Sequence, residues 1–106
     1  MSSFERIKKF LEEVKKENIH FKQHFYRRTI ERPISEELVL KYIEQTERLL
    51  KVEEQPARRA GEEKYKIWMK LSNRYSLVLI ITVSKKDLYI VTGWNTDRKW
   101  QKSIQK

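Results

Sequence analysis

The chain has 106 residues, no cysteine and a formal net charge of +9. That length is enough for one domain, residues 1–106, with one hydrophobic core, and the lack of cysteine excludes disulfides, thiolate metal ligands and thiol catalysis. The longest mainly apolar run, Leu77 to Val83, is far shorter than the roughly 20 residues that span a bilayer, and no apolar signal segment begins the sequence, so we expect a cytoplasmic protein with no membrane partner.

Two helices are expected first. Apolar residues from Phe4 to Val14 recur at helical spacing after a serine that can cap, so this helix should run to about Asn18. A second, short helix should cover His20 to Glu31. It should end at Arg32, because Pro33 disfavours helical geometry in the residue before it.

A third helix has the strongest start signal in the chain. Ser35 can cap it, and Glu36 and Glu37 place carboxylates in its first turn, where they interact favourably with the helix dipole. The apolar residues that follow at helical spacing should form a buried stripe: Leu38, Val39, Tyr42 and Ile43.

The second half of the chain has the pattern of a β-sheet. Leu49 to Glu53 predicts an edge strand, which a polar loop follows. Apolar and polar residues alternate from Lys64 to Leu71, and Tyr75 to Ser84 is apolar on both faces, as in a central strand. A Lys-Lys-Asp turn then leads into Leu88 to Trp94. We expect three or four antiparallel strands.

The carboxy-terminal segment should form a short basic helix. Asn95, Thr96 or Asp97 can cap it, and Trp100 and Ile104 lie one helical turn apart. The expected fold class is therefore α+β: amino-terminal helices packed on a three- to four-stranded antiparallel sheet, with a short carboxy-terminal helix.

Motifs of several common enzyme classes are absent from the sequence. It contains no phosphate-binding glycine loop, no Gly-x-Ser-x-Gly elbow and no zinc pattern. His20 and His24 could share a metal with Glu17, but two ligands at this spacing arise often by chance and no further ligand cluster follows. We expect neither a metal nor another cofactor.

One ridge of basic residues could carry chemistry, since His24, Arg28 and Arg32 recur every four residues. An imidazole can move a proton near neutral pH while a guanidinium neutralises charge on a phosphate. His24 and Arg28 are therefore the candidate catalytic residues, and Arg32 is a candidate nucleic-acid contact. The alternative is structural: the arginines pair with nearby glutamates and His24 packs at the edge of the sheet.

Lys66, Trp68 and Lys70 form a second constellation on one face of the alternating strand. An aromatic ring between cations suits single-stranded RNA, because bases stack on the indole while the ammonium groups follow the backbone. In the alternative, the third helix covers Trp68 and the lysines only extend outward.

The positive charge is unevenly distributed along the chain. Residues 35–55 contain three Lys or Arg against six Glu, whereas residues 56–75 contain six against two. The basic groups can therefore collect on one side of the domain, where counterion release favours a polyanion such as RNA.

Three segments carry a resemblance to a known family: His24-x3-Arg28-x3-Arg32-x-Ile34-Ser35-x3-Val39, an extended strand from Tyr65, and Leu88-Tyr89-Ile90-Val91-Thr92 before a basic tail. From about His20 onward the chain resembles the small domains of the RelE/ParE toxin superfamily, including BrnT-like members and a related uncharacterised branch.

The resemblance implies a RelE-like fold and the toxin of a toxin–antitoxin pair, an endoribonuclease that needs no metal and is neutralised by an acidic antitoxin. Its substrate would be RNA, with mRNA, free or ribosome-associated, as the expected form. The ribose 2′-hydroxyl would attack the neighbouring phosphate, with His24 as acid or base and Arg28 as phosphate clamp. The remaining candidate nucleic-acid contacts are Arg74, Trp94, Arg98 and Lys99. A non-catalytic nucleic-acid-binding module and a protein-interaction domain on the same scaffold stay open as alternatives.

Overall fold

The computed structural model of the chain describes residues 2–23, 25, 34–57 and 60–97. Its helices and strands, with two 3-10 turns (η), follow in the order α1 (Ser3–Glu13), η1 (Lys16–Asn18), β1 (Ile19–Phe21), α3 (Glu36–Ile43), η2 (Thr46–Arg48), β2 (Leu49–Gln55), β3 (Glu63–Lys70), β4 (Tyr75–Ser84) and β5 (Asp87–Asp97). The class is α+β, as expected. Within these ranges no helix is long and apolar enough to cross a membrane.

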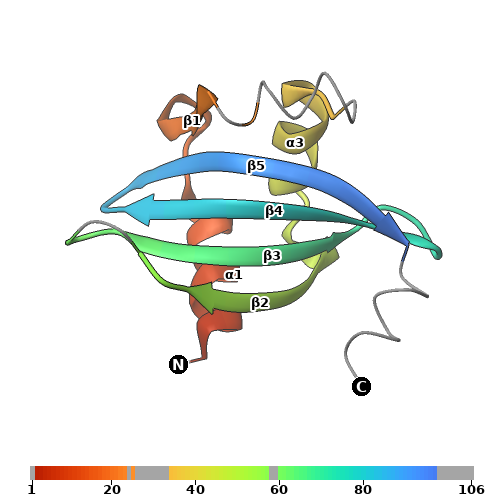
Figure 1. Cartoon of the computed structure of the whole chain (residues 1–106), viewed down its shortest axis with the longest axis horizontal. Helices are drawn as coiled ribbons and strands as arrows, with labels where there is room; N and C mark the ends of the chain where they lie inside the picture. The colour runs from red at the N-terminus through yellow and green to blue at the C-terminus, as the bar shows by residue number, and fades with distance from the viewer. Residues whose placement is uncertain (1, 24, 26–33, 58–59, 98–106) are drawn as a thin grey trace.

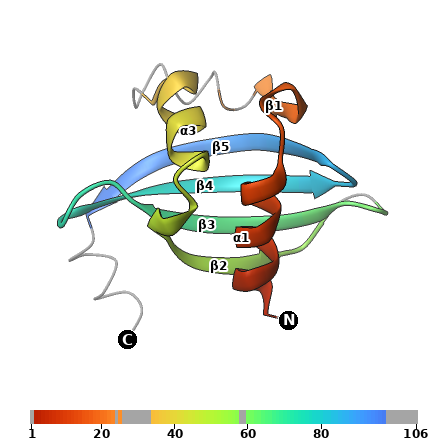
Figure 2. The same cartoon turned by 180° about the vertical axis from the view of Figure 1, so that it is seen from behind.

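The five strands form one sheet in the order β1-β5-β4-β3-β2. Strands β2 to β5 form an antiparallel meander, whereas β1 pairs parallel to β5 at the opposite edge. The predicted three- or four-stranded antiparallel sheet was therefore wrong in strand number and in direction. Both α1 and α3 lie on one face of the sheet (Figures 1 and 2), which we call the helix-covered face; the opposite face is the outer face.

The hydrophobic core lies between the sheet and the two helices. Ile7 and Leu11 of α1 and Val39 and Ile43 of α3 are almost fully buried against it. Alternate residues of the central strands supply the sheet side of this core: Tyr65, Ile67, Met69, Leu77, Leu79, Ile81 and Val83. The alternation predicted from Lys64 onward is confirmed.

The start of α3 is confirmed and the end of α1 is corrected. The Ser35 hydroxyl accepts a hydrogen bond from the backbone N–H of Leu38 at 3.1 Å, as an N-cap should. Helix α1 ends at Glu13 and not near Asn18, because Val14 has an extended backbone conformation. The apolar periodicity continues one residue past the point where the backbone leaves the helix.

Two expected helices are replaced, in part, by strands. His20 lies in β1 and not in a helix, because Ile19 and Phe21 pair with Leu88 and Ile90 of a strand distant in sequence. Three residues are too short for a period-two pattern to be read. Gln23 and Phe25 are helical, as the second expected helix predicts, and its residues 24 and 26–33 lie outside the described residues. Strand β5 runs to Asp97, through the residues expected to cap a closing helix, and the rest of that helix also lies outside the described residues.

Candidate nucleic-acid interface

A row of register partners crosses four strands on the outer face. Lys51 of β2 pairs with Trp68 of β3, Trp68 pairs with Val78 of β4, and Val78 pairs with Trp94 of β5. Trp68 is outside the cluster of residues that packs under α1 and α3. The alternative in which the third helix covers Trp68 was therefore wrong, because α3 packs on the opposite face (Figure 2).

Lysine ammonium groups lie over the two indoles of this row. The Nζ atom of Lys51 is 4.8 Å from the centroid of the Trp68 ring, and that of Lys66 is 4.9 Å from the same centroid. Lys66 Nζ is also 5.5 Å from the centroid of the Trp94 ring. All three distances are within the roughly 6 Å at which a cation is attracted to an aromatic face. We call Lys51, Lys66, Trp68 and Trp94 the Lys/Trp cluster.

The two tryptophans differ in exposure. Trp68 is only 6% exposed, whereas Trp94 is half-buried. A base can therefore reach the ring of Trp94 more readily than that of Trp68. The buried indole of Trp68 instead positions Lys51 and Lys66 and holds their charge at the surface.

Two β-bulges bring the members of the Lys/Trp cluster to one face. In β2 the register shifts between Leu49, which pairs with Met69, and Lys51, which pairs with Trp68. Leu50 is the extra residue and is 39% exposed. A bulge changes the alternation by one residue, so Lys51 lies on the outer face although Leu49 is in the core.

Strand β5 has a corresponding bulge. Ile80 of β4 pairs with Thr92, but the next residue of β4 pairs with Ile90, which leaves Val91 as the extra residue. Ile90 belongs to the core, and strict alternation would place Trp94 on the same side. The bulge places Trp94 opposite Val78, where Lys66 contacts its ring, while another part of the indole packs against the core.

Gly93 lies where β5 resumes its alternation, with little space for a side chain. Here the backbone faces the core closely, so that a Cβ atom would lie 2.7 Å from Cδ2 of Leu79 and 3.2 Å from the carbonyl oxygen of Val78. A side chain at this position would require the Leu79 methyl group to move and the backbone beside Val78 to shift slightly. The glycine therefore permits the close approach of β5 to β4 beside Trp94.

A carboxylate of the described residues, Glu53, lies beside the Lys/Trp cluster and pairs in register with Lys66. Glu53, the next residue on the same side of β2, lies 3.8 Å from the ammonium of Lys51, and both side chains are more than 40% exposed. Gln55 also donates a hydrogen bond to Glu53. An ion pair as exposed as this one is weak, so Lys51 remains able to contact a phosphate.

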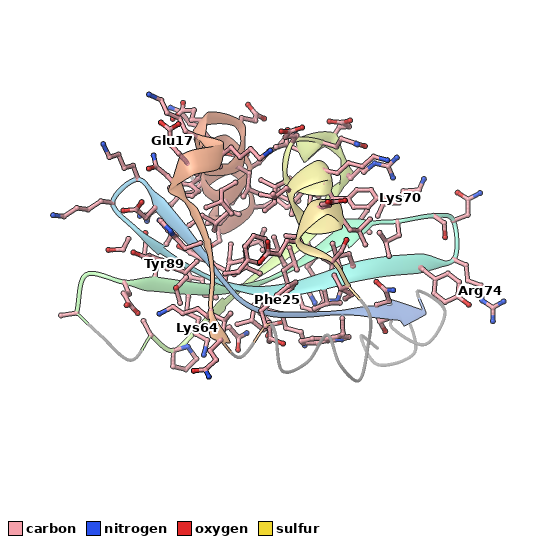
Figure 3. All side chains as sticks on the ribbon, turned by 90° about the horizontal axis from the view of Figure 1, so that it is seen from above. Glu17, Phe25, Lys64, Lys70, Arg74 and Tyr89 are labelled. Atoms are coloured by element: carbon pink, nitrogen blue, oxygen red, sulfur yellow. The ribbon has the colours of Figure 1, made fainter. Side chains whose placement is uncertain are left out.

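The structure unites some of the predicted contacts and separates others. Lys66, Trp68 and Trp94 meet, as described. Lys70 is the last residue of β3, and Arg74 lies in the β3–β4 turn, at the opposite end of the sheet from Lys64 (Figure 3). The Arg74 guanidinium instead lies 5.4 Å from the centroid of the Tyr75 ring.

Five predicted site residues lie outside the described residues: His24, Arg28, Arg32, Arg98 and Lys99. Their proposed roles stay predictions. Lys51, in contrast, was missed by sequence reasoning, because its face depends on the bulge in β2. Across the described part of the chain, no three His, Asp or Glu residues are grouped so that they could hold a metal ion.

Comparison with family profiles, curated proteins and solved structures finds no match to this chain. The RelE/ParE resemblance therefore stays a prediction.

Proposed function

We propose that this protein binds single-stranded RNA across the outer face of its sheet. The observation that carries the proposal is the position of the Lys66 ammonium, 4.9 and 5.5 Å from the centroids of two indoles that belong to different strands. Cations beside aromatic rings on a sheet supply both parts of single-strand recognition: attraction for the phosphates and a surface on which an unpaired base can stack.

The net charge supports the same partner. A chain of 106 residues with a net charge of +9 attracts polyanions, and phosphate contacts release counterions when a nucleic acid binds. Figure 3 shows Lys64 on the side of the sheet opposite the two helices. Lys64 and Lys66 alternate with core residues on β3, so the strand carries positive charge along the outer face.

The test compares two double variants, each of which replaces two lysines on one side of the domain by glutamine. The Lys51→Gln/Lys66→Gln double variant should lower affinity for a ten-nucleotide single-stranded RNA about tenfold or more at 0.1 M salt, measured by fluorescence anisotropy. Its slope of log affinity against log salt should fall by about 1.4, since each contact with a single strand contributes about 0.7.

The matched control is Lys9→Gln/Lys41→Gln, which removes the same charge from α1 and α3. It should change affinity less than threefold, because its lysines lie on the other side of the domain. Equal losses in both double variants would show that only the overall charge matters, and an absence of RNA binding by the unaltered protein would contradict the proposal. Thermal melting followed by circular dichroism checks that each variant is folded.

Cleavage of the bound RNA is a separate proposal, supported by the resemblance to RelE/ParE toxins and by the sequence pattern of His24 and Arg28. His24→Ala and Arg28→Ala should keep RNA binding and lose cleavage, measured on a denaturing gel. Undiminished cleavage by both variants would contradict these roles. Neutralisation by an acidic antitoxin is proposed on the same grounds.

A further inference from the structure

A second aromatic and cationic cluster lies at the β1 edge of the sheet. His20 of β1 and Tyr89 of β5 are register partners, and their rings stack with centroids 5.0 Å apart and an interplanar angle of 27°. Lys22 Nζ is 5.0 Å from the centroid of the Tyr89 ring. His20 Nε2 lies 3.2 Å from Oδ1 of Asp87. We call these four residues the edge cluster.

The edge cluster lies on the same face as the Lys/Trp cluster. Tyr89 pairs with Thr82 of β4, and Thr82 pairs with Lys64 of β3. Thr82 and Val78 are four residues apart on β4, so their side chains lie on one side of the sheet. Val78 pairs with Trp94. The outer face therefore carries Tyr89 at one end and Trp94 further along the same strand.

Stability alone does not explain this arrangement. The side chain of His20 is 45% exposed and that of Asp87 is 34% exposed, so their pair contributes little to folding. Lys22 is exposed as well. The groups nevertheless have fixed mutual positions, because β1 pairs with β5 and Asp87 contacts the imidazole.

We propose that the edge cluster binds one nucleotide of the RNA strand, an inference that rests on the proposed function. The base stacks on the exposed side of the His20 ring, which is itself stacked on Tyr89, and the neighbouring phosphate pairs with the Lys22 ammonium. Asp87 holds the imidazole in its stacking orientation. Lys85 and Lys86, in the adjacent turn, add positive charge at this edge.

The spacing of the two clusters sets a minimum length for the RNA. Tyr89 pairs with Thr82 and Trp94 pairs with Val78, four positions apart on β4, which corresponds to about 13 Å at a strand rise of about 3.3 Å per residue. A single strand that reaches both clusters needs several nucleotides, and single-strand sites of about 4 to 16 nucleotides are common. Affinity should therefore rise steeply once the oligonucleotide exceeds about four nucleotides.

The experiment compares edge variants with matched controls on a ten-nucleotide RNA. Tyr89→Leu and Lys22→Gln should each lower affinity for the RNA about fivefold. The controls are Tyr75→Leu, at the opposite end of the sheet, and Lys16→Gln, on η1, and each should change affinity less than twofold. If Tyr89→Leu fails to fold, the comparison of Lys22→Gln with Lys16→Gln still tests the proposal, because Lys22 is exposed. An RNA with 4-thiouridine at single positions should also cross-link to His20 or Tyr89, read by mass spectrometry.

The outcomes separate this inference from the proposed function. If the edge variants behave like their controls while Lys51→Gln/Lys66→Gln lowers affinity tenfold, the edge cluster is not a nucleotide subsite but the outer face still binds RNA. If neither set of variants lowers affinity, the proposed function itself is wrong. Cross-links confined to residues outside the edge cluster would also overturn the inference.

Discussion

The two faces of the sheet use neighbouring residues of the same strands for different purposes. On β4, Leu77, Leu79 and Ile81 have no exposed surface and pack under the helices. Their neighbours face the other way, and Val78 lies between two tryptophans whose rings are contacted by lysine ammonium groups. The helix-covered face excludes charge, whereas the outer face positions it. The outer face is also largely buried along its middle, where Val78 is 1% and Trp68 6% exposed, and its charge is carried by Lys51 and Lys66 over the Trp68 ring.

The largest expected effect is a difference in the free energy of unfolding between a variant in the core and a variant on the outer face. Leu79→Ala should lower the free energy of unfolding by about 2–5 kcal/mol, since it leaves a cavity in a fully buried part of the core. Ile80→Ala, on the adjacent outer-face position, should cost clearly less because Ile80 is partly exposed. Urea denaturation measures both. An equal cost would contradict the partial exposure of Ile80.

A smaller effect is expected where β5 approaches β4. Gly93→Ala should cost about 1–3 kcal/mol, because the new Cβ atom would overlap Cδ2 of Leu79. Its neighbour Thr92 is buried on the outer face of the sheet, and the described part of the chain offers the Thr92 hydroxyl no hydrogen-bond partner. Thr92→Val should therefore be neutral or stabilising. Thermal unfolding compares the two, and a stable Gly93→Ala would contradict the close approach described here.

The smallest effect concerns alkaline pH and the tyrosine on the helix-covered face. Burial raises the pKa of Tyr65 above 10.0, helped by the hydrogen bond that its hydroxyl donates to Glu63 at 3.0 Å. The folded state therefore holds this proton more tightly than the unfolded state. The corresponding stability is present below pH 10.0 and is lost as the pH rises through the raised pKa.

Tyr65→Phe tests this linkage. The variant should lose less of its free energy of unfolding between pH 9 and pH 11 than the unaltered protein, measured by urea denaturation at each pH. Tyr75→Phe, at a tyrosine that is 43% exposed, serves as the control and should follow the unaltered protein. Parallel curves for the Tyr65→Phe variant and the unaltered protein would contradict the raised pKa.

Local sequence patterns predicted the elements whose signals are contained in a few adjacent residues. The Ser35 cap, the alternation of β3 and the central position of β4 are confirmed. Strand β1 was missed, since its three residues are stabilised by a parallel partner distant in sequence. A short strand of this kind has no periodicity of its own.

By itself, the sequence determined the α+β class, the net positive charge and the presence of Lys66 and Trp68 on one side of β3, because alternation along a single strand needs no partner. Only the tertiary structure decided that Lys51 and Trp94 join them. Each follows a β-bulge, and a bulge exists only in the pairing of two strands. One extra residue turns the following side chains to the opposite face, so membership of the Lys/Trp cluster depends on strand register.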